Sequence, residues 1–199
     1  HLDRDRYEVV PVLISRTGGW PIEPKALSKM VDVAFIAMHG EYGEDGTVQE
    51  LLRDLGIPYT GSDVMSSALA MNKALSYRVL GGHGITIPRH TVVSSHHLGG
   101  FDFNAFHLPA FVKPVDRGSS IGVSLVRRVT ELPAAIDKAL SFSRGVLIEE
   151  YIPGRELTCA VVDDAMGGAF PLPVTEIKPK MKTFFDYSAK YTKGASDEI

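Results

Sequence analysis

The sequence predicts an α/β protein, because apolar runs typical of buried strands alternate with segments of helical periodicity. Two runs, residues 7–14 and 31–38, are continuous and rich in β-branched side chains, as strands buried on both faces are. A helix is predicted over 47–55, followed by a short strand and turn over 57–61. Four residues form the apolar face of this helix: Val48, Leu51, Leu52 and Leu55. This strand–helix–strand order predicts a small doubly wound domain.

The composition of the 199 residues, 44% hydrophobic and 23% charged, is ordinary for a soluble globular chain. The net charge of −3 provides no overall basic field for nucleic acid or an anionic membrane. Cys159 is the single cysteine, which excludes an internal disulfide and fits a reducing compartment. No apolar run is long enough to span a bilayer, so we expect a cytoplasmic protein. Neither end is typical of a natural terminus, and we expect residues to be missing at both.

A glycine-spaced loop, residues 39–46, leads from the second predicted strand into the helix. Ligands of doubly wound domains bind at such strand ends, so His39 is a candidate ligand residue. A plain helix-capping loop is the alternative. Thr47 or Asp45 can cap the helix, and Gly56 suits its end.

Two further helices are predicted, over 62–70 and 72–82. Asn72 can cap the second helix and places Lys73 in its first turn. A cation there opposes the helix dipole. Lys73 is therefore either a solvated surface lysine or a lysine held for an anionic ligand.

A strand is predicted over 85–93, and Pro88 favours a position near the edge of a sheet. The connection over 94–108 is polar. Its pair His96 and His97 has no cysteine or carboxylate at metal-binding spacing, so we interpret it as part of a loop.

The most informative stretch, residues 111–124, consists of two apolar runs around a Gly/Ser-rich loop. Such a loop can leave backbone N–H groups pointing inward and form an anion site. Lys113 supplies positive charge, and the loop itself contains two glycines and two serines: Gly118, Ser119, Ser120 and Gly122. An ordinary β-hairpin is the alternative, since glycine and serine are common in turns. No Walker A pattern occurs in the sequence.

The rest of the chain predicts one helix and three strands. Thr130 can cap a helix whose apolar side consists of Leu132, Ile136, Ala139 and Leu140. A strand over 145–152 turns polar at Glu149 and Glu150. An alternating strand over 155–162, with Cys159 as a core residue, and a strand over 169–177 flank a hairpin turn at 163–168.

Several motifs then coincide in one order, and the chain resembles the D-alanine–D-alanine ligases of the ATP-grasp superfamily. The N-terminal motifs are HGEYGEDG at 39–46, IPYTGS at 57–62 and SALAMNK at 67–73. The others are VKP with GSSIGV at 112–123, LIEE at 147–150, GRE at 154–156, LPVTEI at 172–177 and FDYSAKY at 185–191.

The resemblance implies a three-domain ATP-grasp architecture with ATP between the second and third domains. The boundaries would be 1–61 for an N-terminal doubly wound domain, 62–149 for a central domain, and 150–199 for an incomplete C-terminal domain. The implied reaction joins two D-alanines through an acyl phosphate formed with ATP and Mg²⁺, for peptidoglycan synthesis. D-Alanine is the implied small-molecule partner, with no nucleic acid or membrane involved, and the implied assembly is a homodimer.

The resemblance also implies roles for individual residues. Lys73, Lys113 and Lys190 match phosphate contacts. The loop from Gly118 to Gly122, with Ser120, matches a lid over the γ-phosphate. Ser119 and Tyr191 match a hydrogen-bonded pair that positions the first substrate, and His39 matches a histidine near the substrate carboxylate. The nucleoside residues would be Glu149, Glu150, Tyr151 and Ile152 for adenine and Glu156 for ribose.

The sequence departs from the family pattern in two places. The glutamate that completes the Ser119–Tyr191 network would lie upstream of His1. The Mg²⁺ ligands belong to an E-x-N segment that this sequence lacks and that we expect after Ile199. Three other functions stay open: a related carboxylate–amine or D-alanine–D-lactate ligase, a non-catalytic nucleotide-binding fragment, and a doubly wound domain for another small ligand. By the resemblance, Tyr191 would favour an amine as the second substrate.

Overall fold

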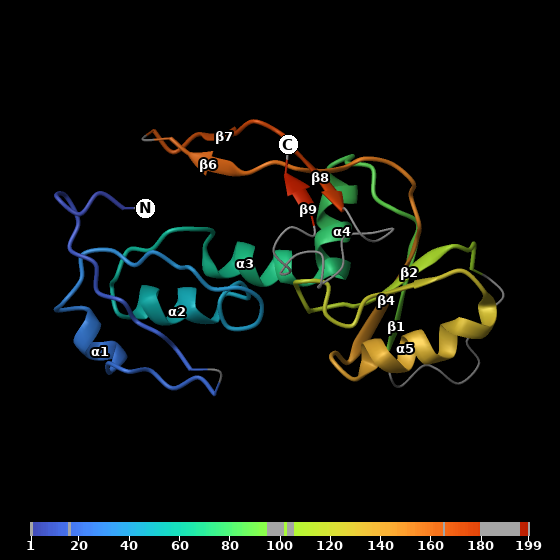
Figure 1. Ribbon diagram of the computed structural model, residues 1–199, viewed down its shortest axis with the longest axis horizontal. Coiled ribbons are helices and arrows are strands. Elements are labelled where there is room, and N and C mark those ends of the chain that lie inside the picture. Colours follow the sequence, from blue (N-terminus) through green and yellow to red (C-terminus); the bar gives the residue numbers. More distant parts are fainter. Residues whose placement is uncertain are drawn as a thin grey trace. The chain divides into compact units, whose positions relative to one another are not determined.

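The structure is a computed structural model that describes residues 2–15, 17–94, 102, 106–164, 166–179 and 196–198. The chain forms two compact units, His1–Leu69 and Ala70–Ile199, whose elements are labelled in Figure 1. Among the described residues, every helix is too short or too polar to span a membrane. The predicted division at 61/62 and 149/150 stays a prediction.

The first unit is built around the predicted amphipathic helix, α2 (Thr47–Asp54). Val48 and Leu52 of α2 are buried, together with Leu27 of the short helix α1 (Pro24–Leu27) and with Ile57. Partly buried residues pack around these four, including Trp20. The predicted apolar face of the helix is therefore confirmed at Val48, Leu52 and Leu55, whereas Leu51 is only half-buried.

The three strands predicted in this unit are wrong, because residues 7–14, 31–38 and 57–61 form no strand. A single parallel bridge joins Ala34 to Tyr59, on either side of α2, which is the direction that a strand–helix–strand unit requires. Val12 packs on the core, whereas the neighbouring Leu13 is 86% exposed. These segments pack one face on the core. Among the described residues, however, they have no neighbouring strand that would complete a ladder of backbone hydrogen bonds.

The helix ends in this region follow their local signals. Asp45 accepts a hydrogen bond from the Thr47 N–H at 2.9 Å, although the N-cap position itself is taken by Gly46. Gly56 has φ +71°, and the N–H groups of Gly56 and Ile57 close the end of α2 on earlier carbonyls. Helices α3 (Val64–Met71) and α4 (Lys73–Gly82) follow. Asn72 caps α4 as predicted, accepting from the Leu75 N–H at 3.1 Å.

The second unit contains a four-stranded antiparallel sheet in the order β1-β4-β2-β3. Its strands are β1 (His90–Ser94), β2 (Ala110–Pro114), β3 (Ser124–Val126) and β4 (Gly145–Glu150). β1 is an edge strand, as Pro88 predicted, and β2 and β3 form the predicted hairpin.

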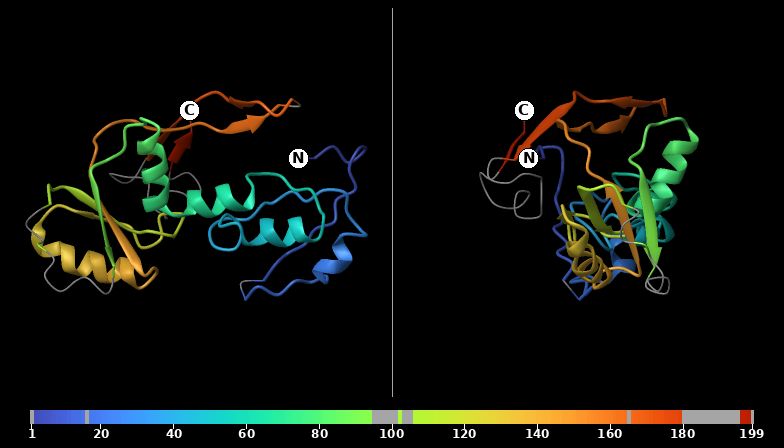
Figure 2. Two further views of the ribbon diagram at one scale, coloured as in Figure 1. Left: turned by 180° about the vertical axis from the view of Figure 1, so that it is seen from behind. Right: turned by 90° about the vertical axis from the view of Figure 1, so that its right-hand side faces the viewer.

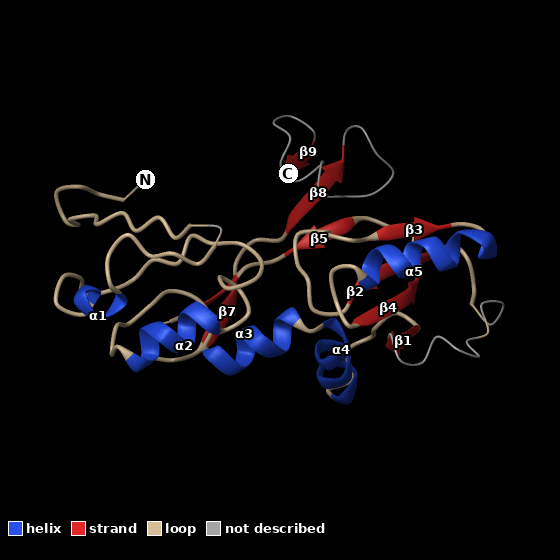
Figure 3. Cartoon of the chain, turned by 90° about the horizontal axis from the view of Figure 1, so that it is seen from below, coloured by secondary structure: helices blue, strands red, loops and turns tan. Residues whose placement is uncertain are grey.

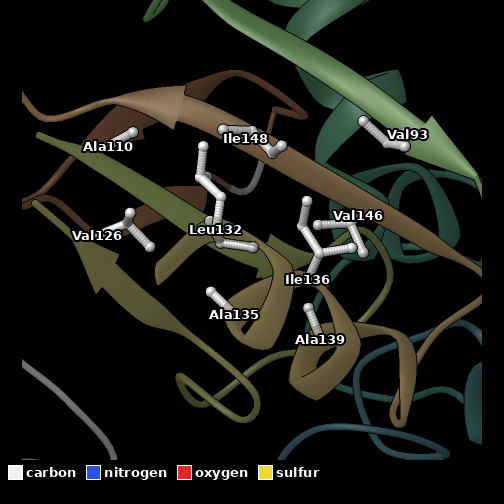
Figure 4. Packing of buried hydrophobic residues seen from close by; sticks show 10 residues of the cluster. Val93, Ala110, Val126, Leu132, Ala135, Ile136, Ala139, Val146 and Ile148 are labelled. Atoms are coloured by element: carbon white, nitrogen blue, oxygen red, sulfur yellow. The ribbon is translucent and has the colours of Figure 1, made fainter. Parts of the chain in front are cut away.

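Helix α5 (Leu132–Leu140) covers one face of this sheet, along β2 and β4 (Figure 3). Leu132 and Ile136 point from α5 toward Val146 and Ile148 of β4, as Figure 4 shows. All four side chains are almost completely buried. The predicted cap at Thr130 is wrong, because Thr130 lies inside a 3-10 turn, η3 (Val129–Glu131), that precedes the helix.

The last part of the unit forms two small sheets. One contains β5 (Glu156–Thr158), β8 (Thr175–Pro179) and β9 (Ser196–Glu198), and the other is the hairpin of β6 (Val161–Asp163) and β7 (Ala169–Pro171). Figure 2 shows that hairpin as a separate two-stranded ribbon. The predicted turn at 163–168 is confirmed, with Asp164 N–H donating to Gly168 O at 2.8 Å.

The two strands predicted over 155–162 and 169–177 are each split, because their halves pair with different partners. β5 pairs with β8, whereas β6 pairs with β7. Cys159 lies in the break between β5 and β6 and is exposed, so its prediction as a core residue is wrong.

Candidate functional site

Helix α5 covers one face of the four-stranded sheet, and the charged side chains of Lys113 and Glu149 lie on the other face. In β2, Ala110 and Val112 are fully buried toward α5. Because side chains alternate along a strand, Phe111 and Lys113 lie on the opposite face. Lys113 is paired in the ladder with Leu147, and Phe111 with Glu149, so Lys113 and Glu149 are diagonal neighbours on that face.

Glu149 is a buried carboxylate with two side-chain partners from different elements. Lys113 Nζ forms an ion pair with Glu149 Oε1, and the Tyr77 hydroxyl of α4 donates to Glu149 Oε2 at 2.7 Å. The side chain of Glu149 is only 6% exposed and that of Lys113 is 22% exposed. An ionised carboxylate at this depth requires such partners, because water no longer solvates it.

Tyr77 is itself held in place on this face. Its ring meets the ring of His90 edge to face, with centroids 5.0 Å apart and planes at 69°. His90 lies directly opposite Glu149 in the β1–β4 ladder. Burial raises the pKa of Tyr77 far above its usual value, and the Glu149 carboxylate raises it further. The phenol therefore stays protonated and donates throughout the neutral range.

The Gly/Ser loop between β2 and β3 contains a tight and strained turn. Ser119 and Ser120 both have positive φ, +52° and +58°, and the Ile121 N–H donates to Gly118 O at 3.1 Å. Two consecutive non-glycine residues in the left-handed region cost free energy and occur mainly at functional sites. Gly122 follows with φ +71°, and a Cβ there would lie 2.7 Å from Pro114 Cγ. Only glycine fits that position without displacing its neighbours.

Lys73 is attached to the segment that leads into this turn. Its backbone N–H donates to Val115 O at 2.9 Å, and its ammonium group donates to Arg117 O. Two of the three lysines predicted to bind phosphate thus belong to the β2–β3 hairpin region. Lys113 lies in β2, and Lys73 contacts the residues that follow that strand.

The neighbouring residues at the end of β4 are engaged differently. The Glu150 carboxylate accepts from the Arg89 N–H at 2.9 Å and from Arg89 Nε at 2.7 Å. The backbone N–H of Arg89, and then its guanidinium, hold the pKa of Glu150 below its usual value. The Tyr151 N–H donates to Pro109 O at 3.0 Å, and its ring lies 5.7 Å from that of Phe111. Ile152 is 59% exposed.

The remaining predicted site residues lie elsewhere or outside the described residues. Glu156 is exposed on β5, in a different sheet from Glu149. His39 belongs to the first unit, where its Nδ1 is 3.9 Å from Glu44 Oε1. Lys190 and Tyr191 lie outside the residues that the structure describes. Within the described ranges, the His, Cys, Asp and Glu side chains form no group of three that could hold a metal ion.

Comparison with known proteins gives the family. Residues 83–199 match the family model "D-ala D-ala ligase C-terminus", and residues 21–62 match "D-ala D-ala ligase N-terminus". The chain belongs to the D-alanine–D-alanine ligase family.

Relatives within the ligase family cover almost the whole chain. The D-alanine–D-alanine ligase of Geobacter sulfurreducens is 42% identical over 194 residues, covering 97% of this chain and 58% of the relative. That of Clostridium perfringens (strain SM101) is 38% identical over 201 residues, covering 100% of this chain and 63% of the relative. The chain thus spans about three fifths of the length of these relatives.

Two solved ligase structures share the α/β fold of this chain. VanG D-Ala:D-Ser ligase from Enterococcus faecalis has a TM-score of 0.79 at 30% identity, covering 100% of this chain and 68% of that one. D-Alanine–D-alanine ligase from Bacillus anthracis complexed with ATP has a TM-score of 0.76 at 32% identity, covering 100% and 60%. The α/β class predicted from the sequence is confirmed.

The structure brings two further residues to this region that were not among the predicted site residues, Tyr77 and Arg89. Tyr77 lies four residues after Lys73 in α4, so both point from the same face of the helix. That spacing was the available signal. Arg89 gave no comparable signal, because its pairing with Glu150 depends on the long-range register of β1 and β4.

Proposed function

We propose that the protein containing this chain joins two D-alanines to D-alanyl-D-alanine, using ATP, for peptidoglycan synthesis. In this reaction ATP phosphorylates the carboxylate of the first D-alanine, and the amine of the second attacks the acyl phosphate. The observation that carries the proposal is the gathering of Lys73, Lys113 and the strained turn at one hairpin, in a chain that belongs to the ligase family.

Lys73 and Lys113 would neutralise the phosphates. Phosphoryl transfer needs little covalent help from the protein and depends on positioning and charge neutralisation. Lys113 is paired with Glu149, and a triphosphate, with more charge than one carboxylate, would draw its ammonium group away. Lys73 would add a second charge at the residues preceding the turn. Lys190 is proposed as a third phosphate contact.

The turn from Gly118 to Gly122 would act as the lid over the γ-phosphate. Positive φ values at Ser119 and Ser120 support this, since strained backbone is typical of ligand clamps. Closing the lid would exclude the water that otherwise hydrolyses an acyl phosphate. Ser119, with Tyr191, would also position the first D-alanine, and His39 would lie near its carboxylate.

The nucleoside would bind at the end of β4 and on β5. Glu149 is our candidate for accepting the exocyclic amine of adenine. Lys113 contacts Oε1 and Tyr77 contacts Oε2, and a carboxylate oxygen has two lone pairs with which to accept hydrogen bonds. Glu150 is held by Arg89 and would contribute through its backbone, with Tyr151 and Ile152. Glu156 would bind the ribose.

Three features of the whole protein belong to the same proposal. These are the three-domain ATP-grasp architecture with ATP between its second and third domains, a homodimeric assembly, and a location in the cytoplasm. Mg²⁺ is the ion that the family resemblance implies, and it would help neutralise the phosphates when bound. The described residues offer no cluster of carboxylates for it.

Phosphate release from ATP by the full-length protein tests the proposal directly. We expect release that depends on D-alanine, yields D-alanyl-D-alanine and is abolished by Lys113→Ala. Equal release with D-lactate or an L-amino acid as the second substrate would contradict the assignment. ATP binding without turnover would instead support a non-catalytic nucleotide-binding protein.

D-Serine is a second candidate for the accepting amine. It is favoured by one observation: the match to VanG D-Ala:D-Ser ligase, with a TM-score of 0.79 over the whole chain. The same assay with D-alanine and D-serine in competition separates the two acceptors. A product mixture dominated by D-alanyl-D-serine would favour the second candidate.

A further inference from the structure

Two side chains from opposite sides hold the carboxylate of Glu149. Lys113 reaches Oε1 from the adjacent strand β2, and Tyr77 reaches Oε2 from helix α4 at 2.7 Å. The carboxylate is 6% exposed, so its orientation depends on these two partners more than on water. The two partners are not interchangeable, because Lys113 carries a charge and Tyr77 does not.

The two partners differ in what a bound nucleotide would do to them. In the proposed function, phosphate competes with Glu149 for the ammonium group of Lys113. Tyr77 carries no charge and has no attraction of that kind. Its hydroxyl therefore remains on Oε2 when Lys113 turns away, and keeps the carboxylate from rotating in a site where free rotation would leave an unpaired buried charge.

We propose that Tyr77 is a positioning residue for nucleobase recognition, whose hydroxyl fixes the Glu149 carboxylate so that it accepts the exocyclic amine of the base. This inference rests on the proposed function and adds a residue to it. Tyr77 acts through Glu149 and does not itself contact the phosphates.

The placement of Tyr77 suits that role. Its ring packs against His90, the residue opposite Glu149 in the sheet, so the hydroxyl is aimed from a fixed ring. The first turn of α4 is fixed in turn by the hydrogen bond from Lys73 N–H to Val115 O. Since Lys73 and Tyr77 share one helix face, α4 would serve the phosphate end and the base end of the same nucleotide.

The proposal predicts a change in base selectivity. Inosine triphosphate (ITP) differs from ATP in carrying a carbonyl oxygen where adenine has its exocyclic amine. A fixed carboxylate attracts that amine and repels that oxygen, so it raises the preference for ATP. A carboxylate free to rotate can turn away from either base, and the preference falls.

The test compares Tyr77→Phe with the wild-type full-length protein by calorimetric titration with ATP and with ITP. Phenylalanine keeps the ring and its contact with His90 and removes only the hydroxyl. We expect the Kd for ATP to rise about tenfold, the size of one lost hydrogen bond to a charged group, and the Kd for ITP to change by less than about twofold. The kcat and the KM for D-alanine should stay within about twofold, because the phosphate contacts remain.

Two controls separate positioning from general damage. The preference for ATP is measured as the ratio of the Kd for ITP to the Kd for ATP. Tyr7→Phe, which removes an exposed tyrosine hydroxyl in the first unit, should leave this ratio unchanged. Glu149→Gln should lower the ratio, and adding Tyr77→Phe to it should change the ratio by less than about twofold, because Tyr77 acts through that carboxylate. Melting temperatures without nucleotide report any loss of folding.

The outcomes distinguish this inference from the proposed function. Suppose the wild-type protein binds ATP and Tyr77→Phe leaves the ratio of the Kd for ITP to the Kd for ATP unchanged. The role of Tyr77 is then overturned, even if the variant melts earlier, while the proposed function stands. A wild-type protein that binds no ATP overturns the proposed function and this inference with it.

Discussion

The backbone N–H of Lys73 donates to the carbonyl oxygen of Val115 at 2.9 Å, which ties the start of α4 to the end of β2. The ammonium group of the same residue donates to Arg117 O, two residues further along. Lys73 therefore restrains the segment that leads into the strained turn. A substitution at this position keeps the first hydrogen bond and removes the second.

Lys73→Met should weaken ATP binding far more than it weakens the fold. Loss of the bond to Arg117 O should lower the free energy of unfolding by about 1 kcal/mol. Loss of a charged phosphate contact should raise the Kd for ATP between about tenfold and a hundredfold. Calorimetric titration and urea unfolding measure the two effects. Lys29→Met, an exposed lysine in the first unit, is the control and should change neither; equal losses in both variants would contradict the role of Lys73.

Gly122→Ala should destabilise the second unit. The new Cβ would lie 2.7 Å from Pro114 Cγ and 2.8 Å from Phe142 Cδ2, at a φ of +71° that alanine disfavours. Left-handed strain and overpacking together should cost about 2–4 kcal/mol, seen as a lower melting temperature in calorimetry. Gly82→Ala, where a Cβ meets nothing within 4 Å, should leave stability unchanged or slightly raised. An unchanged melting temperature for Gly122→Ala would show that the hairpin shifts freely.

Gln49→Ala should destabilise the first unit specifically. Gln49 is 5% exposed, and its Nε2 donates to Gly43 O at 2.8 Å, joining α2 to the loop that contains His39. Loss of this bond and of buried volume should cost about 2–3 kcal/mol. The fluorescence of Trp20, the only tryptophan and part of the same core, reports unfolding of this unit in urea.

The neighbouring substitution Glu50→Ala is the control for Gln49, since Glu50 is exposed on α2. It should change stability by no more than about 0.5 kcal/mol. If the two variants unfold at the same urea concentration, the buried amide does not hold the loop.

The pairing of Glu150 with Arg89 should give stability that depends on pH. The pKa of Glu150 is lowered in the folded protein, so the folded state binds fewer protons and the contribution is present above the unfolded-state pKa. It is lost as the pH falls from the unfolded-state pKa through the lowered folded pKa. Arg89→Leu should therefore lower the melting temperature at pH 7, and by progressively less as the pH is lowered. Arg78→Leu, an exposed arginine in α4, should show no such difference; a pH-independent effect of Arg89→Leu would argue against the ion pair.

The errors of the sequence analysis share a physical cause. Strands over 7–14 and 31–38 were predicted from composition, but a strand exists only where a neighbouring strand completes its ladder, and composition does not say where that neighbour is. Cys159 has the alternation of a half-buried strand and yet is exposed, because β5 and β6 pair with different strands. Tyr77 carries a signal in its spacing from Lys73 but gains its meaning from Glu149, 72 residues away.

The sequence by itself determined the family, the α/β class, the helices with their ends at Asn72 and Gly56, and the Gly/Ser hairpin, because caps, helical periodicity and tight turns are set by residues close together in the chain. Only the tertiary structure decided which carboxylate at the end of β4 is buried with Lys113 and Tyr77 and which pairs with Arg89. Successive side chains of a strand point to opposite faces, so the surroundings of Glu149 and Glu150 depend on what the rest of the fold brings to each face.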